Sequence, residues 1–345
     1  MSKLFFLLSG EHPTLPASEL RAILEAEGYR FRVLETLTQL LRLDAPLDAV
    51  QPIAGRAALT RICGLELLYC NSSLQEIMRG VRSIPLEDYV EPGETFVVRI
   101  RRVRGSARSL SRTMLERKIG EVILEEVGGL RVDLFHPEKT FFGVLTDEKF
   151  VFGLKLAEIQ PKPFVNRMPH KKPFFHPAAM PPKLARCMVN LARPRRGDLI
   201  LDPFCGTAGI LIEAGLIGCR VLGFDVKRHM AAGGLRNLLY YGVKPEGMLV
   251  ADARKPPILR ADRIVTDPPY GRSASTLGLT TREIVWRMLS WVGDVLPEGG
   301  MVCLASPKTL GIGELGVAAG LEHVESHFVY VHGSLTREIA VFRCG

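Results

Sequence analysis

The stretch Leu201-Asp202-Pro203-Phe204-Cys205-Gly206-Thr207-Ala208-Gly209 follows the apolar run 199–201 and leads into a helical pattern that extends to Leu216. A short apolar strand, a turn that contains glycine and a helix are typical of the first unit of a doubly wound α/β sheet. Gly206 and Gly209 let the backbone of the turn approach a ligand closely. Their spacing differs from G-x-G-x-x-G, which disfavours a dinucleotide-dependent oxidoreductase.

The alternation of strand and helix patterns continues from about residue 180 onward. Apolar runs that predict strands lie at 199–201, 220–224, 248–251, 263–266 and 301–305, and helical patterns extend to 216, to 241 and over 282–295. Two further β-like runs, 324–331 and 338–343, have no helical pattern between them, which favours an antiparallel hairpin at one edge. We therefore predict an α/β domain with a Rossmann-like, doubly wound parallel sheet and an antiparallel edge hairpin.

An aspartate follows each of four successive predicted strands, namely Asp202, Asp225, Asp252 and Asp267. The carboxyl ends of parallel strands meet at one edge of the sheet, where a ligand crevice lies. Aspartate is also common there as a solvated helix cap, but four acids in register are harder to explain in this way. Asp225 is placed to accept hydrogen bonds from ribose hydroxyls, and Asp252 from an adenine amino group. A ligand with a ribose, an amine and no phosphate fits, and the cationic S-adenosylmethionine has these features.

The tetrapeptide Asp267-Pro268-Pro269-Tyr270 begins at the fourth of these acids. The exocyclic amine of a base is a poor nucleophile because its lone pair is delocalised into the ring. Asp267 can accept one N–H of such an amine, and the Pro268 carbonyl, held rigid by two prolines, can accept the other. Tyr270 can stack on the base, so catalysis would rest on positioning and electrostatics without a metal. Taken alone, the tetrapeptide is also compatible with an ordinary turn after a strand.

The net charge of +8 is unevenly distributed. The segment 161–197 has nine basic and no acidic residues, and 99–118 has eight basic residues against Glu116 alone. A charge run is usually a solvated face, but two runs as one-sided as these favour contact with a phosphate backbone. The candidate RNA contacts in them are Arg99, Arg101, Arg102, Arg104, Arg108, Arg112, Lys171 and Lys172.

The first 156 residues show mixed α and β patterns in two blocks. In 1–55 we predict a strand at 4–8, a helix at 18–27 and a further ordered run at 31–43. In 56–156 the patterns predict helices at 57–69, 72–81 and 110–127, and strands at 95–101, 132–134, 140–145 and 150–156. Five prolines in 157–179 predict a semi-rigid linker without regular structure.

The seven cysteines are scattered and contain no C-x-x-C pair, so a zinc site is not expected. Whether Cys63 and Cys70 form a disulfide or remain two free thiols is left open by the sequence. Cys205 is interpreted as a small residue of the turn and not as a nucleophile, because no base is placed beside it. No run of 18 apolar residues occurs and the start is not a credible signal peptide, so we expect a cytoplasmic protein. The chain has only eight Asn and Gln residues while Arg is abundant, and this composition is typical of proteins from thermophiles.

The two motifs of the C-terminal block resemble those of class I S-adenosylmethionine-dependent methyltransferases of the amino-methylating branch. The middle block is similar to a THUMP domain, an RNA-binding module, through the runs 97–103, 117–120 and 132–137. The junction formed by 173–177 and 182–191 is similar to that of the archaeal tRNA guanine-10 N2-methyltransferases. The resemblance covers nearly the whole chain and is least specific at the N-terminus.

The resemblance implies four segments: a ferredoxin-like α+β domain at 1–55, a THUMP domain at 56–156, the basic linker at 157–179 and the catalytic domain at 180–345. The substrate implied is a guanine in tRNA, which must be flipped out of its stack to reach the crevice. Whether one or two methyl groups are added to each guanine remains open. A monomer is sufficient for this activity. Other readings are an amino-methyltransferase for adenine or a glutamine side chain, or a non-catalytic RNA-binding protein.

The residue roles implied by the resemblance complete the candidate site. Candidate cofactor-binding residues are His176, Asp202, Phe204, Cys205, Gly206, Gly209, Asp225, Asp252, Ala253 and Asp267. Candidate catalytic residues are Asp267, Pro268, Pro269 and Tyr270. Phe175 and His176 are expected to close over the cofactor, although a structural or phosphate-binding His176 is an equal alternative. Arg272 is either a contact to the substrate backbone or a solvated loop residue.

Overall fold

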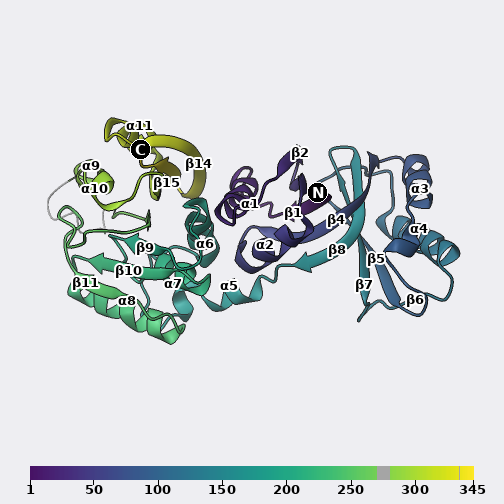
Figure 1. Ribbon diagram of the computed structural model, residues 1–345, viewed down its shortest axis with the longest axis horizontal. Coiled ribbons are helices and arrows are strands. Elements are labelled where there is room, and N and C mark those ends of the chain that lie inside the picture. The colour runs from purple at the N-terminus through teal and green to yellow at the C-terminus, as the bar shows by residue number, and fades with distance from the viewer. Residues whose placement is uncertain (270–279, 334) are drawn as a thin grey trace. The chain divides into compact units, whose positions relative to one another are not determined.

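The computed structural model describes residues 1–269, 280–333 and 335–345 (Figure 1). The chain forms two compact units. Unit 1 comprises Met1–Ala17, Gly28–Ala54 and Leu59–Ile159, and unit 2 comprises Ser18–Glu27, Gly55–Ala58 and Gln160–Gly345. The borders of the four segments expected from the resemblance remain predictions. None of the described helices is both long and apolar enough to cross a membrane.

Unit 1 is built on one sheet of eight strands in the order β2-β3-β1-β4-β8-β7-β5-β6. The strands are β1 (Ser2–Leu8), β2 (Arg32–Leu37), β3 (Leu40–Ala45), β4 (Thr60–Asn71), β5 (Thr95–Arg102), β6 (Arg131–Val132), β7 (Lys139–Thr146) and β8 (Lys149–Glu158). The long strand β4 pairs with β1 on one side and with β8 on the other. Strands from both N-terminal blocks of the sequence therefore share a single sheet.

The helix predicted at 57–69 is wrong, because most of this segment is strand β4. Apolar runs of this length are ambiguous between a buried helix and a strand with sheet on both sides. Gly64 supports the strand, since a Cβ at this position would lie 2.2 Å from the ring of Phe5 on β1. Only glycine lets that ring cross the neighbouring strand. The strands predicted at 4–8, 95–101, 140–145 and 150–156 are confirmed, and the run 31–43 is the hairpin β2–β3. The strand predicted at 132–134 overlaps β6 only at Val132, because the Asp133 carboxylate accepts the N–H groups of Phe135 and His136 and forms a turn there.

Two helices cover the sheet of unit 1 in its second half, α3 (Leu74–Arg82) and α4 (Arg112–Glu126). Both predicted helices are confirmed within a few residues at each end. Each begins at a serine whose hydroxyl accepts a backbone N–H three residues on, at 3.2 Å for Ser73 and 3.3 Å for Ser111. Both helices bury apolar side chains against phenylalanines of β5, β7 and β8, which form the core of this part.

Unit 2 contains a seven-stranded sheet in the order β11-β10-β9-β12-β13-β15-β14. Its strands are β9 (Leu199–Asp202), β10 (Arg220–Asp225), β11 (Gly247–Val250), β12 (Arg263–Thr266), β13 (Met301–Pro307), β14 (Glu322–His332) and β15 (Leu335–Arg343). β15 runs antiparallel to both of its neighbours, and the pairs among β9 to β13 are parallel. The predicted doubly wound sheet with an antiparallel edge hairpin is confirmed. The strand order reverses between β9 and β12, which is the switch point of such sheets.

The helices of unit 2 are α5 (Lys162–Asn166), α6 (Pro182–Leu191), α7 (Gly209–Leu216), α8 (Arg228–Tyr240), α9 (Thr281–Leu289), α10 (Val292–Val295) and α11 (Ile312–Ala318). The linker was predicted to lack regular structure, but α5 forms there because proline is tolerated in a first helical turn. The single helix predicted over 282–295 is two helices, interrupted at Trp291. The indole of Trp291 donates a hydrogen bond of 2.8 Å to the Ala253 carbonyl.

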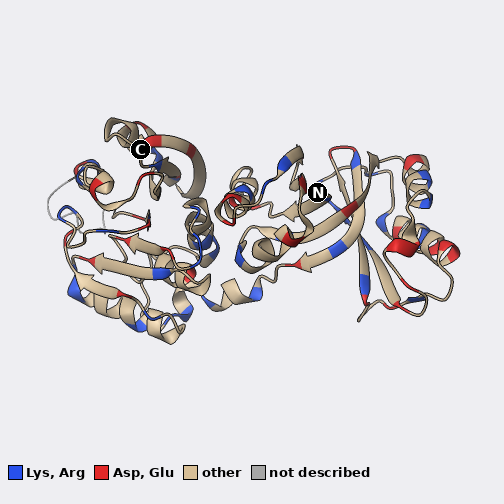
Figure 2. Cartoon of the chain, viewed as in Figure 1, with Lys and Arg blue, Asp and Glu red and all other residues tan. Residues whose placement is uncertain are grey.

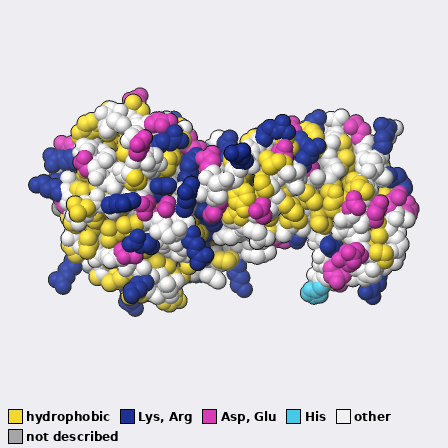
Figure 3. Space-filling model, in the orientation of Figure 1, with side chains coloured by type: hydrophobic (Ala, Val, Ile, Leu, Met, Phe, Trp, Pro, Cys, Tyr) yellow, Lys and Arg dark blue, Asp and Glu magenta, His cyan; other side chains and the backbone are white. Residues whose placement is uncertain are grey.

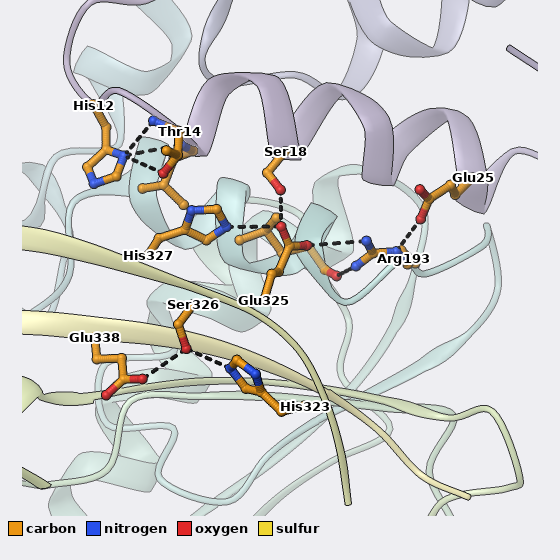
Figure 4. A network of polar contacts seen from close by, with 12 residues as sticks. His12, Thr14, Ser18, Glu25, Arg193, His323, Glu325, Ser326, His327 and Glu338 are labelled. Atoms are coloured by element: carbon orange, nitrogen blue, oxygen red, sulfur yellow. Dashed lines mark hydrogen bonds and ion pairs between the residues drawn. The ribbon is translucent and has the colours of Figure 1, made fainter. Parts of the chain in front are cut away.

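Unit 2 also includes most of α1 (Leu15–Ala26) and the end of α2 (Val50–Arg56). The carboxylate of Glu325 on β14 accepts hydrogen bonds from Ser18 of α1 and from Arg193 at 3.2 Å (Figure 4). His327 lies 3.1 Å from the same carboxylate. Burial raises the pKa of Glu325, but the contacts with His327, Ser18 and Arg193 outweigh it and lower the pKa to about 2. An ionised carboxylate therefore joins a helix from the start of the chain to the last hairpin.

Candidate active site

The four predicted aspartates lie at the carboxyl edge of the sheet of unit 2: Asp202 and Asp225 end β9 and β10, and Asp252 and Asp267 follow β11 and β12. Asp202 is paired in register with Gly223, and Asp225 with Val250. The hydroxyl of Thr266, the last residue of β12, donates a hydrogen bond of 2.6 Å to Asp202. This bond joins the ends of the two strands that flank the switch point.

Asp202 is the most buried of these acids, with 2% of its surface exposed. Its carboxylate accepts the Phe204 N–H at 3.1 Å, in addition to the Thr266 hydroxyl. Burial raises the pKa of Asp202 to about 7, and the negative charges of Asp267 and Asp225 act in the same direction. Asp202 is therefore close to its titration point at neutral pH, and a cationic ligand beside it would favour the ionised form.

The turn after β9 is braced by the end of β10. Gly206 and Ala208 have φ angles of 49° and 60°, in the left-handed region. One Asp225 oxygen accepts the Gly206 N–H at 3.2 Å and the other accepts the Lys227 N–H at 2.9 Å. Gly234 of α8 packs against the same turn so closely that a Cβ at this position would lie 2.9 Å from the Gly206 carbonyl oxygen. The turn is thus held in shape by contacts from both sides.

Cys205 lies inside this turn and is buried. Its backbone N–H donates to the Phe224 carbonyl at 3.1 Å. Burial raises the pKa of the Cys205 thiol well above its ordinary value, and the nearby Asp202 and Asp225 add to the effect. A thiol that resists ionisation is a poor nucleophile, which supports the interpretation of Cys205 as a small packing residue.

Asp252 is engaged by a residue that sequence reasoning missed. Arg254 donates from Nε to both Asp252 oxygens, at 2.9 and 2.7 Å, and also from Nη2. These bonds lower the pKa of Asp252 and fix the direction of its carboxylate. The next residue, Ala253, is buried and receives the Trp291 indole described above. An arginine two positions after an acid was the only signal in the sequence.

Asp267 begins the predicted catalytic tetrapeptide directly after β12. Its Oδ2 lies 3.5 Å from Nη2 of Arg337, a buried residue of β15. Arg337 was not predicted, because 70 residues separate it from Asp267 and only the sheet brings them together. Pro268 is buried, and the Pro269 carbonyl accepts the Thr281 hydroxyl at 3.4 Å. Tyr270 and Arg272 lie outside the described residues.

The segment before α6 is attached to the turn by Asn237 of α8, which is fully buried. Its side chain accepts the Phe174 N–H at 2.9 Å and donates to the carbonyls of Phe174 at 2.9 Å and Thr207 at 3.0 Å. Gly233 makes room for the Phe174 ring, which a Cβ would approach to 2.1 Å. Phe175 and His176 follow in the sequence and are exposed, and Nδ1 of His176 accepts the Ala178 N–H at 3.3 Å. That this pair closes over the cofactor stays a prediction.

The predicted RNA-contacting residues fall into three groups. Arg99 and Arg102 donate to backbone carbonyls of their own unit, at 2.8 Å to Leu134 and 3.1 Å to Ala107. The exposed residues are Arg101, Arg104, Arg108, Arg112 and Lys171. Lys172 is buried, which makes it unsuited to a phosphate backbone on the surface. On the face shown in Figure 3, basic side chains are scattered over both units and do not form one patch.

Comparison with known proteins agrees with this geometry. Residues 169–337 match a family model described as an RMKL-like methyltransferase domain, and 71–154 match the THUMP domain. The chain is 41% identical to the tRNA (guanine(10)-N2)-dimethyltransferase of Methanothermobacter thermautotrophicus over 98% of both chains. The enzyme of the same name from Methanocaldococcus jannaschii is 31% identical, over 98% of this chain and 99% of its own.

Solved structures show the same fold. TrmN from Thermus thermophilus superposes with a TM-score of 0.56 at 22% identity, covering 99% of this chain and 100% of its own. A putative methyltransferase complexed with SAH has a TM-score of 0.53 at 14% identity, covering 100% and 99%. With its THUMP and RMKL-like methyltransferase domains and its near full-length relatives, the chain belongs to the family of the archaeal tRNA (guanine(10)-N2)-dimethyltransferases.

Proposed function

We propose that this protein transfers methyl groups from S-adenosylmethionine to the exocyclic N2 of guanine-10 in tRNA. The products are N2-methylguanosine and N2,N2-dimethylguanosine. The observation that carries the proposal is the meeting of Asp202, Asp225 and Asp267 at the switch point, where Asp267 also begins Asp-Pro-Pro-Tyr. The names of the relatives supply the base and its position.

The residues at this edge fit the cofactor. Asp225 ends β10, where a carboxylate accepts hydrogen bonds from ribose hydroxyls, and the Gly206 backbone leaves a close approach open. The shared negative charge around Asp202 suits a ligand with sulfonium and ammonium groups. When bound, the cofactor supplies an electrophilic methyl group.

Asp267 and the Pro268 carbonyl orient the target amine as hydrogen-bond acceptors. Asp267 must be ionised for this task, although other carboxylates lie close to it. Arg337 provides the compensating positive charge at 3.5 Å. The bound cofactor would supply the methyl group and leave as S-adenosylhomocysteine, and Asp267 would accept the proton that the target nitrogen loses. Positioning and electrostatics then account for catalysis without a covalent enzyme intermediate.

The substrate is a base inside a folded RNA, and the THUMP match at 71–154 supports RNA binding by unit 1. Base flipping costs a few kcal/mol, which contacts between the protein and RNA phosphates must offset. The exposed arginines between 101 and 112 are our candidates for these contacts.

The test is incubation with an unmodified tRNA transcript and S-adenosylmethionine labelled in the methyl group, followed by digestion and identification of nucleosides. We expect label in both methylated guanosines at one tRNA position. Asp267→Asn should lower kcat by about 10²- to 10³-fold, while the exposed Asp294→Asn of α10 serves as the control. Label in DNA or in a protein glutamine instead of tRNA would refute the proposal.

A further inference from the structure

Lys172 is buried at the point where the turn leads into α7. Only 7% of its surface is exposed, although it lies in the most basic segment of the chain. A Cβ at Gly209, the first residue of α7, would lie 3.3 Å from the Lys172 ammonium. The ammonium group therefore stands beside the N-terminus of an eight-residue helix.

The carboxylate near Lys172 is already shared by two other cations. Glu213 of α7 receives Arg167 through bonds of 2.6 and 3.0 Å, and Arg186 of α6 lies 2.9 Å from its Oε2. Within residues 1–269, 280–333 and 335–345, no hydrogen bond or ion pair reaches the Lys172 ammonium. The Glu213 carboxylate is thus paired with the half-buried Arg167 and the buried Arg186, while the buried Lys172 has no paired anion among the described residues.

This arrangement is unfavourable without a further anion. The N-terminus of a helix carries partial positive charge, and an ammonium beside it is repelled. Burial lowers the pKa of Lys172 to about 8; Glu213 opposes the change and Arg167 adds to it. An apolar side chain would fill the same space at less cost. The site has the features of an anion-binding position, with backbone N–H groups and a buried cation.

The position of Lys172 relative to the turn indicates which anion. Lys172 precedes Phe174 by two residues, and Asn237 holds Phe174 against Thr207 of the turn. Asp225 and Asp252 lie at the ends of the next two strands, where the adenosine part of the cofactor is expected. The cofactor carries one carboxylate, on the methionyl part at its other end.

We propose that Lys172 and the N-terminus of α7 bind the carboxylate of the methionyl group of the cofactor. The inference rests on the proposed function, because it takes S-adenosylmethionine as the ligand of this turn. Lys172 is then a cofactor-binding residue and not an RNA contact.

The test measures calorimetric binding of two ligands, S-adenosylhomocysteine and 5′-methylthioadenosine, which lacks the carboxylate. Lys172→Met should lower the affinity for S-adenosylhomocysteine by about tenfold to a hundredfold, which is the usual contribution of a charge-assisted hydrogen bond. The affinity for 5′-methylthioadenosine should not change. The matched control is Lys171→Met, which removes the same charge from the exposed neighbouring position and should change neither affinity.

A second measurement separates ligand binding from a structural role. Without ligand, Lys172→Met should melt at the wild-type temperature or above it, because an uncompensated buried cation has been removed. A clear decrease in melting temperature would show that the ammonium stabilises the fold and would overturn the proposal.

The proposal would also be overturned if Lys172→Met lowered the affinity for both ligands equally, or if it left the affinity for S-adenosylhomocysteine unchanged. Loss of tRNA affinity alone would assign the site to an RNA phosphate and refute the carboxylate assignment. If the wild-type protein bound neither ligand, the proposed function itself would fail, which is a distinguishable result.

Discussion

Two basic segments look alike in the sequence and differ in the structure. The arginine arm, which we define as Arg101, Arg104, Arg108 and Arg112 of unit 1, is exposed at all four positions. The linker cations, defined as Arg167 and Lys172 of unit 2, are half-buried and buried. Figure 2 shows basic residues at both ends of α5, where Lys162 and Arg167 stand. Of these two sets, the arm keeps its charges available to a partner in solution, as do the exposed Lys162 and Lys171 of the linker segment.

The difference arises from residues far from either segment. Glu213, which pairs with Arg167, lies 46 residues farther along the chain and one turn inside α7. An excess of basic residues counts charges but does not show where their partners lie. A charge run therefore predicts a nucleic-acid contact only where its side chains remain solvated.

The largest expected effect comes from removing the buried carboxylate of the linker. Glu213→Gln leaves Arg167 and Arg186 without their shared counter-charge, and we expect it to lower the free energy of unfolding by about 3–5 kcal/mol. The control is Glu246→Gln, which breaks the exposed pair with Arg220. We expect the loss of this surface pair to lower the free energy of unfolding by about 0–1 kcal/mol. Chemical denaturation monitored by circular dichroism measures both, and equal losses would remove the distinction between buried and solvated charges.

A smaller effect is expected where the linker is held by hydrogen bonds. Asn237→Ala removes two partly buried hydrogen bonds to Phe174 and one buried hydrogen bond to Thr207, and leaves these backbone groups unsatisfied. We expect a loss of about 1–3 kcal/mol in unfolding free energy, with weaker binding of S-adenosylhomocysteine.

Asn71→Ala is the control for this change, because Asn71 also makes several side-chain bonds, to Glu76 and Lys149, but in an exposed position of unit 1. We expect a change of about 0.5 kcal/mol or less and unaltered ligand binding. If Asn237→Ala left ligand affinity intact, the segment at Phe174 would not help to shape the cofactor site.

The parts that sequence predicted correctly depend on local pattern. The turn 201–209, the strands around it and the edge hairpin follow from short apolar runs, glycine and the positions of Asp202 and Asp225. Strand β4 was missed because its consecutive residues are buried or half-buried, so both faces of the strand are covered and the sequence lacks the alternation typical of a half-exposed strand. Arg337 and Asn237 were missed because their roles come from contacts across the sheet and between helices, which no spacing in one sequence reveals.

The smallest effect on stability is expected in the arginine arm, where the effect on RNA binding should be large. A variant with all four arm residues changed to Gln should unfold within about 0.5 kcal/mol of wild type, because exposed charges contribute little. The slope of log affinity for tRNA against log salt should fall by about one for each arginine that binds a phosphate in the wild-type complex. A control with Lys3, Arg30, Arg32 and Arg79 changed to Gln removes the same charge from exposed positions of the same unit. If the control lowered the slope equally, the arm would contribute only net charge and would not be a defined contact surface.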